Sequence, residues 1–362
     1  LRIPDAPTAN ELIKDKLVAA NWLQKQGSGS KDWVAKAAGL GMALSRKTLD
    51  SSLSKIGQPI IREAMIRAMQ MMGKQFVLGT SIEDAISNAK AATKDGYRMS
   101  YDMLGEGARD AATAERYFES YSHAIDSISA CNGDDLLANA GISVKLSALH
   151  PRYVYAQKER ALPHIIEKLK ILCAKAVASN MPLTIDAEEV HRLDLSIEVF
   201  DALLSDPAFK GWDGLGLAVQ AYQKRSIHLI DYIAHKAREA ERKVQVRLVK
   251  GAYWDTEIKV AQMGGFNEYP VFTRKCNTDV SFLACAQEML ANNDVIYSMF
   301  ATHNVHTIAA VRNMAKEKGV DYEFQRLHGM GEGVYAHIIG DSDVKVSVYA
   351  PVGPHKDLLP YL

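Results

Sequence analysis

Short apolar runs alternate with amphipathic stretches over most of the chain. From Tyr97 onward, eight strand-like runs end in polar or glycine residues, and most are followed by a helical pattern. These runs cover residues 98–104, 142–149, 183–186, 215–220, 244–249, 296–302, 322–327 and 344–349. Strands that alternate with helices form right-handed βαβ units on a parallel sheet. Eight such units over roughly 265 residues predict an α/β fold, a TIM-like (βα)8 barrel.

A doubly wound open sheet is the competing architecture. Sheets of this type that bind dinucleotides carry a G-x-G-x-x-G turn between a strand and a helix. The nearest match, Gly329 to Gly333 (GMGEG), lies near the end of the chain and lacks that spacing. The pattern therefore favours the closed barrel.

The stretch before residue 96 follows a helical pattern. Apolar residues recur on one face over residues 10–21 and 59–73, with a glycine- and serine-rich loop (QGSGS) at 26–30. Thr80 and Glu83 form a capping-box pattern before a helix at 82–94. We expect an α-helical arm over residues 1–95 and a barrel over residues 96–362.

Composition and charge narrow the class of protein. The 362 residues include 43 basic and 43 acidic side chains, so no global field attracts nucleic acid, and we expect none to be bound. The four cysteines, Cys131, Cys173, Cys276 and Cys285, show no disulfide framework, which fits a reducing compartment. No apolar run reaches the roughly 18–20 residues that span a bilayer, and no signal peptide opens the chain. We expect a cytoplasmic location.

Polar groups gather at the predicted carboxyl ends of the strands, where a (βα)8 barrel places its active site. In the stretch 246–255 (VRLVKGAYWD), an apolar strand leads directly into Arg247, Lys250 and Tyr253. The other strand ends contribute Glu106, Lys145, Asp186 with Glu188 and Glu189, Gln220, His303 with Asn304, Gln325 with His328, and Tyr349. Because buried polar groups cost free energy unless they are paired, this set predicts a functional site.

Schiff-base chemistry is one use for such a site. Lys145 or Lys250 fits the reactive lysine of a barrel aldolase, in which a desolvated amine attacks a carbonyl. An ion pair with Asp186 or a neighbouring carboxylate is the simpler role for either lysine.

A divalent metal is a second use, and the pattern supports it only weakly. His303 and His328, with Asp186 or Glu188, have suitable ligand atoms. No histidine pair is spaced to hold an ion from one element, so we expect no metal. For Glu188 and Glu189 the simpler role is a solvated helix start.

A planar organic cofactor that becomes anionic is the third use. The guanidinium of Arg247 suits negative charge on a heteroaromatic ring. Gln220 and His303 suit the ring edge, and Trp254 offers an aromatic face. Phosphates would meet Lys250, Gly251, Ala252, Thr273 and Arg274. From the chemistry of the residues alone, a bound planar cofactor is as well supported as an aldolase.

Seven segments of the sequence carry a family resemblance. They are VRLVKGAYWDTEIK, VKLSALHPRY, IDAEE, AVQAYQKR, FATHN, QRLHGMGE and YAPVG. They resemble, in order and approximate spacing, the proline dehydrogenase domain of the bacterial bifunctional flavoenzymes called proline utilization A. The resemblance covers nearly the whole chain and includes LRIPD at its start.

The resemblance implies a distorted (βα)8 barrel that binds FAD and oxidises L-proline to Δ1-pyrroline-5-carboxylate, the first step of proline catabolism to glutamate. Hydride passes to flavin N5 and the electrons pass to a membrane quinone, with peripheral association at the inner membrane. Larger members add an aldehyde dehydrogenase domain, and some add an amino-terminal DNA-binding ribbon-helix-helix segment. We expect neither in this sequence.

The resemblance also implies roles for individual residues. It places Arg247 at the flavin N5 edge, Gln220 at the pyrimidine edge, and Lys145 on the substrate carboxylate. Asp186 orients the cations and Glu106 supports the site, while Tyr253, Leu327 and Tyr349 pack around the pyrrolidine ring with Ala252 close by. The implied FAD lining comprises Val249, Lys250, Gly251, Trp254, Thr273, Lys275, Thr302, His303, Asn304 and Gln325.

One departure from the family pattern concerns the carboxylate anchor. In the family, an eighth barrel helix supplies an adjacent arginine pair, and this sequence stops at Leu362 before it. Because arginine pairs are strong carboxylate anchors, we expect Lys145 alone to hold proline poorly and this chain to be weakly active or inactive. A non-catalytic alternative is an interaction module that binds a partner through residues 1–95, with a degenerate barrel and no cofactor.

Overall fold

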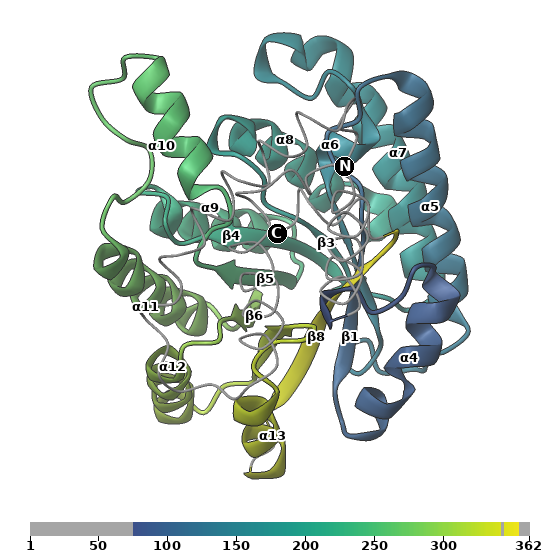
Figure 1. Cartoon of the computed structure of the whole chain (residues 1–362), viewed down its shortest axis with the longest axis vertical. Helices are drawn as coiled ribbons and strands as arrows, with labels where there is room; N and C mark the ends of the chain where they lie inside the picture. Colours follow the sequence, from purple (N-terminus) through teal and green to yellow (C-terminus); the bar gives the residue numbers. More distant parts are fainter. Residues whose placement is uncertain (1–74, 342–343, 355–362) are drawn as a thin grey trace, which may run out of the picture. The chain divides into compact units, whose positions relative to one another are not determined.

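The structure is a computed structural model that describes residues 75–341 and 344–354 (Figure 1). By its internal contacts the chain divides into two compact units, Leu1–Gly73 and Lys74–Leu362. All described residues belong to the second unit. The elements expected at residues 10–21, 26–30 and 59–73 lie outside the described residues.

Eight parallel strands form a closed barrel and follow one another in sequence order (Figure 1). The strands are β1 (Arg98–Met103), β2 (Gly141–Val144), β3 (Leu183–Ile185), β4 (Leu215–Gln220), β5 (Val244–Val249), β6 (Ile296–Ala301), β7 (Tyr322–Leu327) and β8 (Lys345–Val352). Pairing of β8 with β1 closes the barrel and sets Tyr349 beside Ser100. The predicted (βα)8 barrel is confirmed.

Helices surround the strands (Figure 1). They are α4 (Ile82–Lys94), α5 (Ala111–Ser129), α6 (Leu146–Leu149), α7 (Lys158–Ala178), α8 (Leu193–Leu204), α9 (Ser226–Glu239), α10 (Trp254–Met263), α11 (Lys275–Ala291), α12 (Val305–Lys318) and α13 (Glu332–Asp341). Short 3-10 turns occupy Tyr155–Gln157, Val190–Arg192 and Pro207–Phe209. Local signals set several helix ends: the Asn304 side chain caps α12, and Gly319, at φ +64°, ends it.

Two local predictions were wrong in detail. The run at residues 142–149 is not one strand, because β2 stops at Val144 and Leu146–Leu149 form the short helix α6. Between them, the backbone N–H of Lys145 donates to the hydroxyl of Tyr121, at 3.2 Å. Ser81 rather than Thr80 caps α4, since its hydroxyl accepts a hydrogen bond from the N–H of Asp84.

The barrel interior is unusually polar, whereas branched apolar residues usually fill it. On β5, Val244, Val246 and Leu248 belong to the apolar core, while Gln245 and Arg247 alternate with them. Inward-facing polar residues bond to one another inside the barrel. Arg98–Glu323 and Arg247–Ser143 join strands that are not neighbours, and Gln325–Ser347 joins the adjacent strands β7 and β8. The apolar core therefore lies between strands and helices, and the interior is free to hold charge.

None of the helices in the described part of the chain has both the length and the apolar character needed to cross a membrane.

Candidate active site at the carboxyl end of the barrel

Four buried charged side chains, which we call the charged quartet, meet inside the barrel: Asp102, Lys145, Asp186 and Arg247. Nζ of Lys145 lies 2.6 Å from Oδ1 of Asp102 and 3.4 Å from Oδ2 of Asp186. Nη1 of Arg247 donates to Oδ1 of Asp186 at 2.6 Å. All four residues are buried, and Asp102 has no exposed surface. Two positive charges thus face two negative ones.

The quartet keeps Lys145 charged. Burial by itself lowers the pKa of Lys145, but the negative charges of Asp102 and its other neighbours outweigh burial and hold this pKa well above its usual value. Burial raises the pKa of Asp102, and the nearby ammonium of Lys145 opposes that rise. An ammonium has no lone pair with which to attack a carbonyl, so this environment disfavours a Schiff base at Lys145.

Arg247 lies within β5 and holds its guanidinium across the barrel axis. Nη2 donates to the hydroxyls of Ser100, at 3.1 Å, and Ser143, at 2.9 Å. The guanidinium carbon lies 5.1 Å from the ring centre of Tyr349, within the range of a cation–π contact. Nε is buried and has no partner among the described residues, so one donor stays available to a ligand.

Tyr349 and Leu327 form one wall of this end of the barrel, because they are paired neighbours on β8 and β7. The Tyr349 hydroxyl donates to Oδ2 of Asp186 at 2.6 Å. The backbone N–H of Leu327 donates to Nε2 of His303 at 3.1 Å. Burial, with the nearby positive charge of Arg326, lowers the pKa of His303, which keeps Nε2 free to accept this bond.

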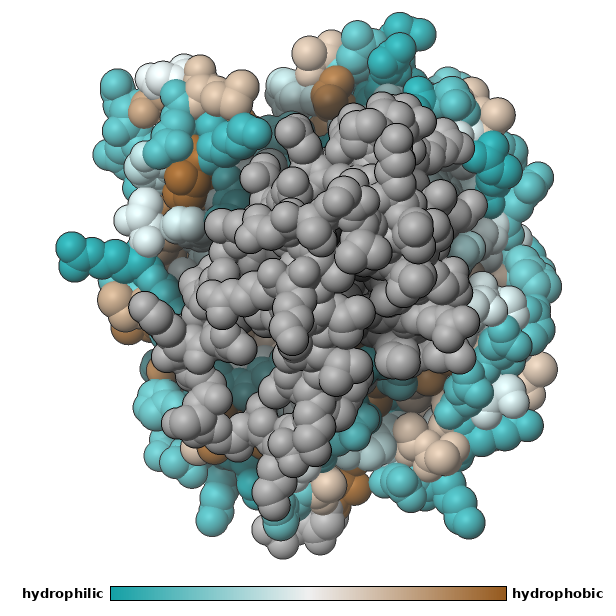
Figure 2. All heavy atoms as spheres, in the orientation of Figure 1, coloured by the Kyte–Doolittle hydropathy of each residue, from teal (hydrophilic) through white to brown (hydrophobic). Residues whose placement is uncertain are grey.

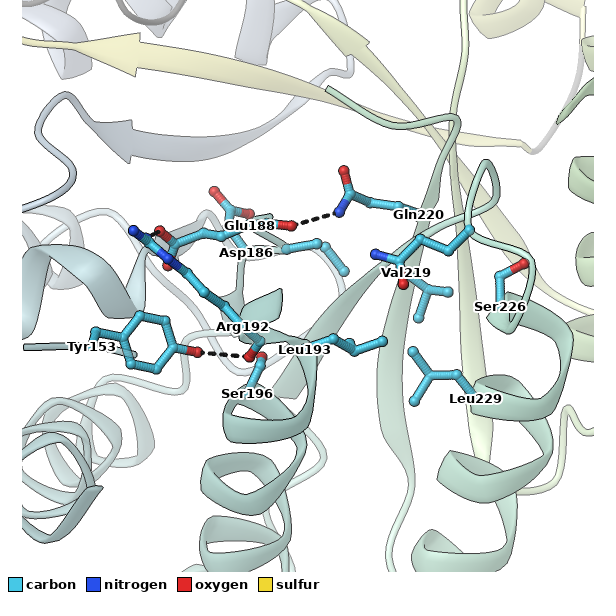
Figure 3. A pocket seen from close by; sticks show the side chains of 13 residues that line it. Tyr153, Asp186, Glu188, Arg192, Leu193, Ser196, Val219, Gln220, Ser226 and Leu229 are labelled. Atoms are coloured by element: carbon cyan, nitrogen blue, oxygen red, sulfur yellow. Dashed lines mark hydrogen bonds and ion pairs between the residues drawn. The ribbon is translucent and has the colours of Figure 1, made fainter. Parts of the chain in front are cut away.

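A chain of hydrogen bonds joins the segments at the carboxyl ends of the first five strands. The N–H of Gly107 donates to the Ser147 hydroxyl, and the N–H of Ser147 donates to Oε1 of Glu188. Nε2 of Gln220 donates to the backbone carbonyl of Glu188 at 2.8 Å, as Figure 3 shows. The N–H of Ala252 then donates to Oε1 of Gln220. Because these bonds run from loop to loop, they fix the rim of the barrel.

Glu106 and Tyr253 lie at the two ends of this chain of hydrogen bonds, next to Gly107 and Ala252 in sequence. Both are partly buried. Burial raises the pKa of each, and the neighbouring charge of Lys145 lowers it again in part. The structure thus brings both residues within electrostatic reach of the charged quartet.

Figure 3 shows a small cavity outside the barrel interior, between β3, β4 and α8. Its lining includes Tyr153, Glu188, Arg192, Val219 and Leu229. Its volume of about 10 Å³ is about the space that one buried water requires. It is therefore too small for a substrate.

The expected FAD-lining residues that follow β5 lie close to those at the start of α11. Lys250 forms an ion pair with Asp279, which also pairs with Lys275 at 2.9 Å. Thr273 is exposed. The indole N–H of Trp254 donates to the carbonyl of Phe272, which joins the start of α10 to the segment before α11.

Gly251 has φ +139°, and a Cβ at this position would lie 2.5 Å from the ring of Tyr222. Only glycine fits such a backbone without strain. The carbonyls of the two residues before Gly251, Val249 and Lys250, accept backbone bonds from the N–H groups of Ala221 and Tyr222. The absence of a side chain at Gly251 therefore lets the backbone after β5 pack directly on the ring of Tyr222.

Other expected lining residues already have partners. The Thr302 hydroxyl accepts from the N–H of Asn304, and the Asn304 side chain caps α12. Gln325 donates to the hydroxyl of Ser347 inside the barrel. Their polar atoms hold the loops and the barrel interior together.

Sequence reasoning missed Asp102, Ser100 and Ser143. Asp102 and Ser100 alternate along β1, so both face the interior, and an acidic residue within a buried strand was the available signal. The expectation of a solvated helix start was wrong for Glu188, which is buried and paired with Arg192 at 2.7 Å. Within the described residues, no group of three potential metal ligands comes together.

Two family models match the chain. The model described as "Proline dehydrogenase" matches residues 85–362, and "DNA-binding domain of Proline dehydrogenase" matches residues 1–76. The second match is at odds with our expectation that the sequence contains no DNA-binding segment. That expectation rested on the net charge of the whole chain, which does not exclude a local binding surface.

Curated relatives match most or all of this chain. "Bifunctional protein PutA" of Klebsiella aerogenes is 45% identical over 100% of this chain and 29% of the relative, and the Escherichia coli protein of the same name matches to the same extent. The chain thus spans less than a third of these relatives. "Proline dehydrogenase 1" of Bacillus subtilis is 25% identical over 77% of this chain and 82% of the relative.

Solved structures of proline utilization A proteins are also similar to this chain. A bifunctional proline utilization A protein superposes with a TM-score of 0.75 at 44% identity, covering 99% of this chain and 37% of that one. Proline utilization A from Bdellovibrio bacteriovorus, inactivated by N-propargylglycine, gives 0.80 at 25% identity over 96% of this chain and 40% of that one. With a family match over residues 85–362, the chain belongs to the proline dehydrogenase family.

Proposed function

We propose that this chain is the proline dehydrogenase part of a longer bifunctional protein. It oxidises L-proline to Δ1-pyrroline-5-carboxylate with FAD as cofactor, and an aldehyde dehydrogenase domain elsewhere in the parent protein acts on the hydrolysed product. The observation that carries the proposal is the charged quartet, in which a buried ammonium and a buried guanidinium lie side by side at the end of the barrel.

The residues at this end fit a planar cofactor that becomes anionic. The unpartnered Nε of Arg247 is a buried donor, and a fixed guanidinium stabilises developing negative charge. The ring of Tyr222 holds the backbone at Gly251 in place, and we assign the amide group of Gly251 to the cofactor. Lys250 and Lys275, held by Asp279, add positive charge suited to a diphosphate.

A bound flavin would supply the acceptor, at N5, for the hydride that leaves C5 of proline. The protein positions the substrate. Lys145 pairs with the proline carboxylate, while Leu327, Tyr349 and Tyr253 pack around the ring beside Ala252. Asp186 orients Lys145 and Arg247, and Glu106 supports this end through its charge.

The remaining residues that we assign to the cofactor lie at the carboxyl ends of the strands and in the segments that follow them. Gln220 lies at the pyrimidine edge of the flavin, where its bonds to two loops hold it in place. The rest of the cofactor surface is lined by Val249, Trp254, Thr273, Thr302, His303, Asn304 and Gln325. We propose that electrons pass from the flavin to a membrane quinone during peripheral contact of the parent protein with the inner membrane.

An anaerobic visible spectrum tests the proposal. The protein is reconstituted with FAD and titrated with L-proline up to a large excess, because Lys145 alone is expected to hold proline poorly, and slow bleaching of the flavin bands is expected. A Lys145→Met variant should bind FAD and bleach only at much higher proline concentrations, whereas Lys158→Met, which removes a partly exposed lysine paired with Glu198, should behave as the unaltered protein. Bands that proline leaves unchanged, or failure to bind FAD, would overturn the proposal.

A further inference from the structure

Asp102 differs from the other acid of the charged quartet in where it is held. Asp186 follows the end of β3, at the start of a loop, whereas Asp102 lies within β1. Its partners in the barrel register are Ser143 on β2 and Pro351 on β8. The backbone of Asp102 lies between two paired strands, so motion of the loops at the rim does not displace this residue.

Lys145 is held more closely by Asp102 than by Asp186. Its Nζ lies 2.6 Å from Asp102 and 3.4 Å from Asp186. The carboxylate of Asp186 receives a bond of 2.6 Å at each oxygen, from Arg247 and from Tyr349. Asp186 is therefore engaged mainly with Arg247 and Tyr349, and the strong charge-assisted bond of Lys145 is the one to Asp102.

We propose that Asp102 is a positioning residue for substrate binding, acting through Lys145. This inference rests on the proposed function, in which Lys145 pairs with the carboxylate of proline. An ammonium has three donors. When one N–H of Lys145 donates to Asp102, the ammonium group is held in one position and its other two donors remain directed at its other neighbours. Less conformational freedom of Lys145 is then lost when a carboxylate binds.

Two effects of Asp102 oppose each other, and the geometry decides between them. Its negative charge neutralises part of the positive charge that attracts a carboxylate, so on charge alone its loss would tighten binding. Its hydrogen bond fixes the ammonium, so its loss would weaken binding. Lys145 reaches the interior on a flexible stem of four carbons, and its remaining bonds, to Asp186 and to the Tyr349 hydroxyl, are both long at 3.4 Å. The loss of position therefore dominates.

The test compares Asp102→Ala with Asp102→Asn in the FAD-loaded protein. Asparagine keeps an acceptor for Lys145 and alanine does not. The KM for L-proline should rise about tenfold (~1.4 kcal/mol) in Asp102→Ala and less in Asp102→Asn, with kcat changed less than KM. The KM for L-prolinamide, which lacks the anionic carboxylate, should change little in either variant.

Asp126→Ala is the matched control. It removes the carboxylate from a surface lysine–aspartate pair of the same length, Lys175–Asp126 at 2.6 Å, and should leave KM unchanged. If Asp102→Ala does not fold, the same comparison of substrates is made with Asp102→Asn alone.

The outcomes separate the two proposals. If L-proline does not reduce the unaltered protein, both proposals fail together. If it does, and the Asp102 variants show an unchanged or lower KM for L-proline, only the positioning role fails. Equal rises for L-proline and L-prolinamide would also overturn it, because a general structural defect does not distinguish the two substrates.

Discussion

The hydroxyl of Tyr349 donates a hydrogen bond of 2.6 Å to Asp186. The ring of the same tyrosine lies 5.1 Å from the guanidinium carbon of Arg247, which in turn binds Asp186. These three residues come from β8, the end of β3, and β5. A contact triangle built from distant parts of the chain forms only when the barrel is closed, so the site depends on completion of the fold.

Tyr349→Phe removes the hydroxyl and keeps the ring over Arg247. Oδ2 of Asp186 then loses its short bond inside a buried site, so the free energy of unfolding should fall by about 1–2 kcal/mol. Urea unfolding measures this change. Tyr232→Phe is the control, because the Tyr232 hydroxyl donates to Asp201 at the surface and its loss should cost much less. Equal losses in the two variants would contradict the prediction.

Arg247→Lys tests the need for a guanidinium. A lysine has no planar fork and cannot reach Asp186, Ser100 and Ser143 from one group as arginine does. The unfolding free energy should fall by about 2–3 kcal/mol, since buried polar groups lose partners, and bound FAD should fall with it. Thermal unfolding and the flavin absorbance of the purified protein measure the two effects.

The control for this change is Arg238→Lys, at an exposed arginine that contacts Asp294 and Asn292. Exposed pairs contribute little, so its stability and flavin content should match those of the unaltered protein. A stable, fully flavin-loaded Arg247→Lys protein would show that the charge alone is sufficient.

Much of the barrel could be predicted, because buried parallel strands read as short apolar runs between turn signals. The bounds of β4, β5 and β7 agree with the predicted runs. The prediction was wrong after Val144 because Leu146–Leu149 continue the apolar run, although they form a buried helix. Apolar character alone does not distinguish the two.

The site could be predicted only in part. The rule that barrels place function at strand ends selected Lys145, Asp186 and Arg247, which the structure brings together. It could not select Asp102, which lies within β1. The acidic side chain of Asp102 within a buried strand was a signal, but its partner, Lys145, follows from the pairing of β1 with β2, which no local pattern encodes.

Gly251→Ala tests the close packing of the backbone after β5 on the ring of Tyr222. An alanine there meets the Tyr222 ring at 2.5 Å and must adopt φ +139°, which costs roughly 1–3 kcal/mol in strain. FAD content and thermal stability should both fall. Gly265→Ala is the control, since this glycine also has a positive φ, +62°, but open space around it. A loss as large at Gly265 would assign the whole effect to backbone strain.

His303 predicts a pH dependence of stability. Its Nε2 accepts the bond from the N–H of Leu327, and a protonated imidazole cannot accept it. Burial, aided by Arg326, lowers its pKa from the ordinary 6.5. The pKa of His303 is therefore lower in the folded than in the unfolded protein. Its contribution to the free energy of unfolding is fully present above pH 6.5 and is lost as the pH falls from there through the folded-state pKa.

The measurement is urea unfolding of the unaltered protein and of His303→Asn between pH 7.5 and 5. Asparagine accepts the Leu327 bond and does not titrate. Both proteins should lose stability at low pH, because His150 and His328 also have lowered pKa values. The unaltered protein should lose more, by up to about 1.4 kcal/mol per pH unit for one additional proton. Parallel curves would mean that His303 takes up no proton on unfolding, and that its bond to Leu327 does not set its charge.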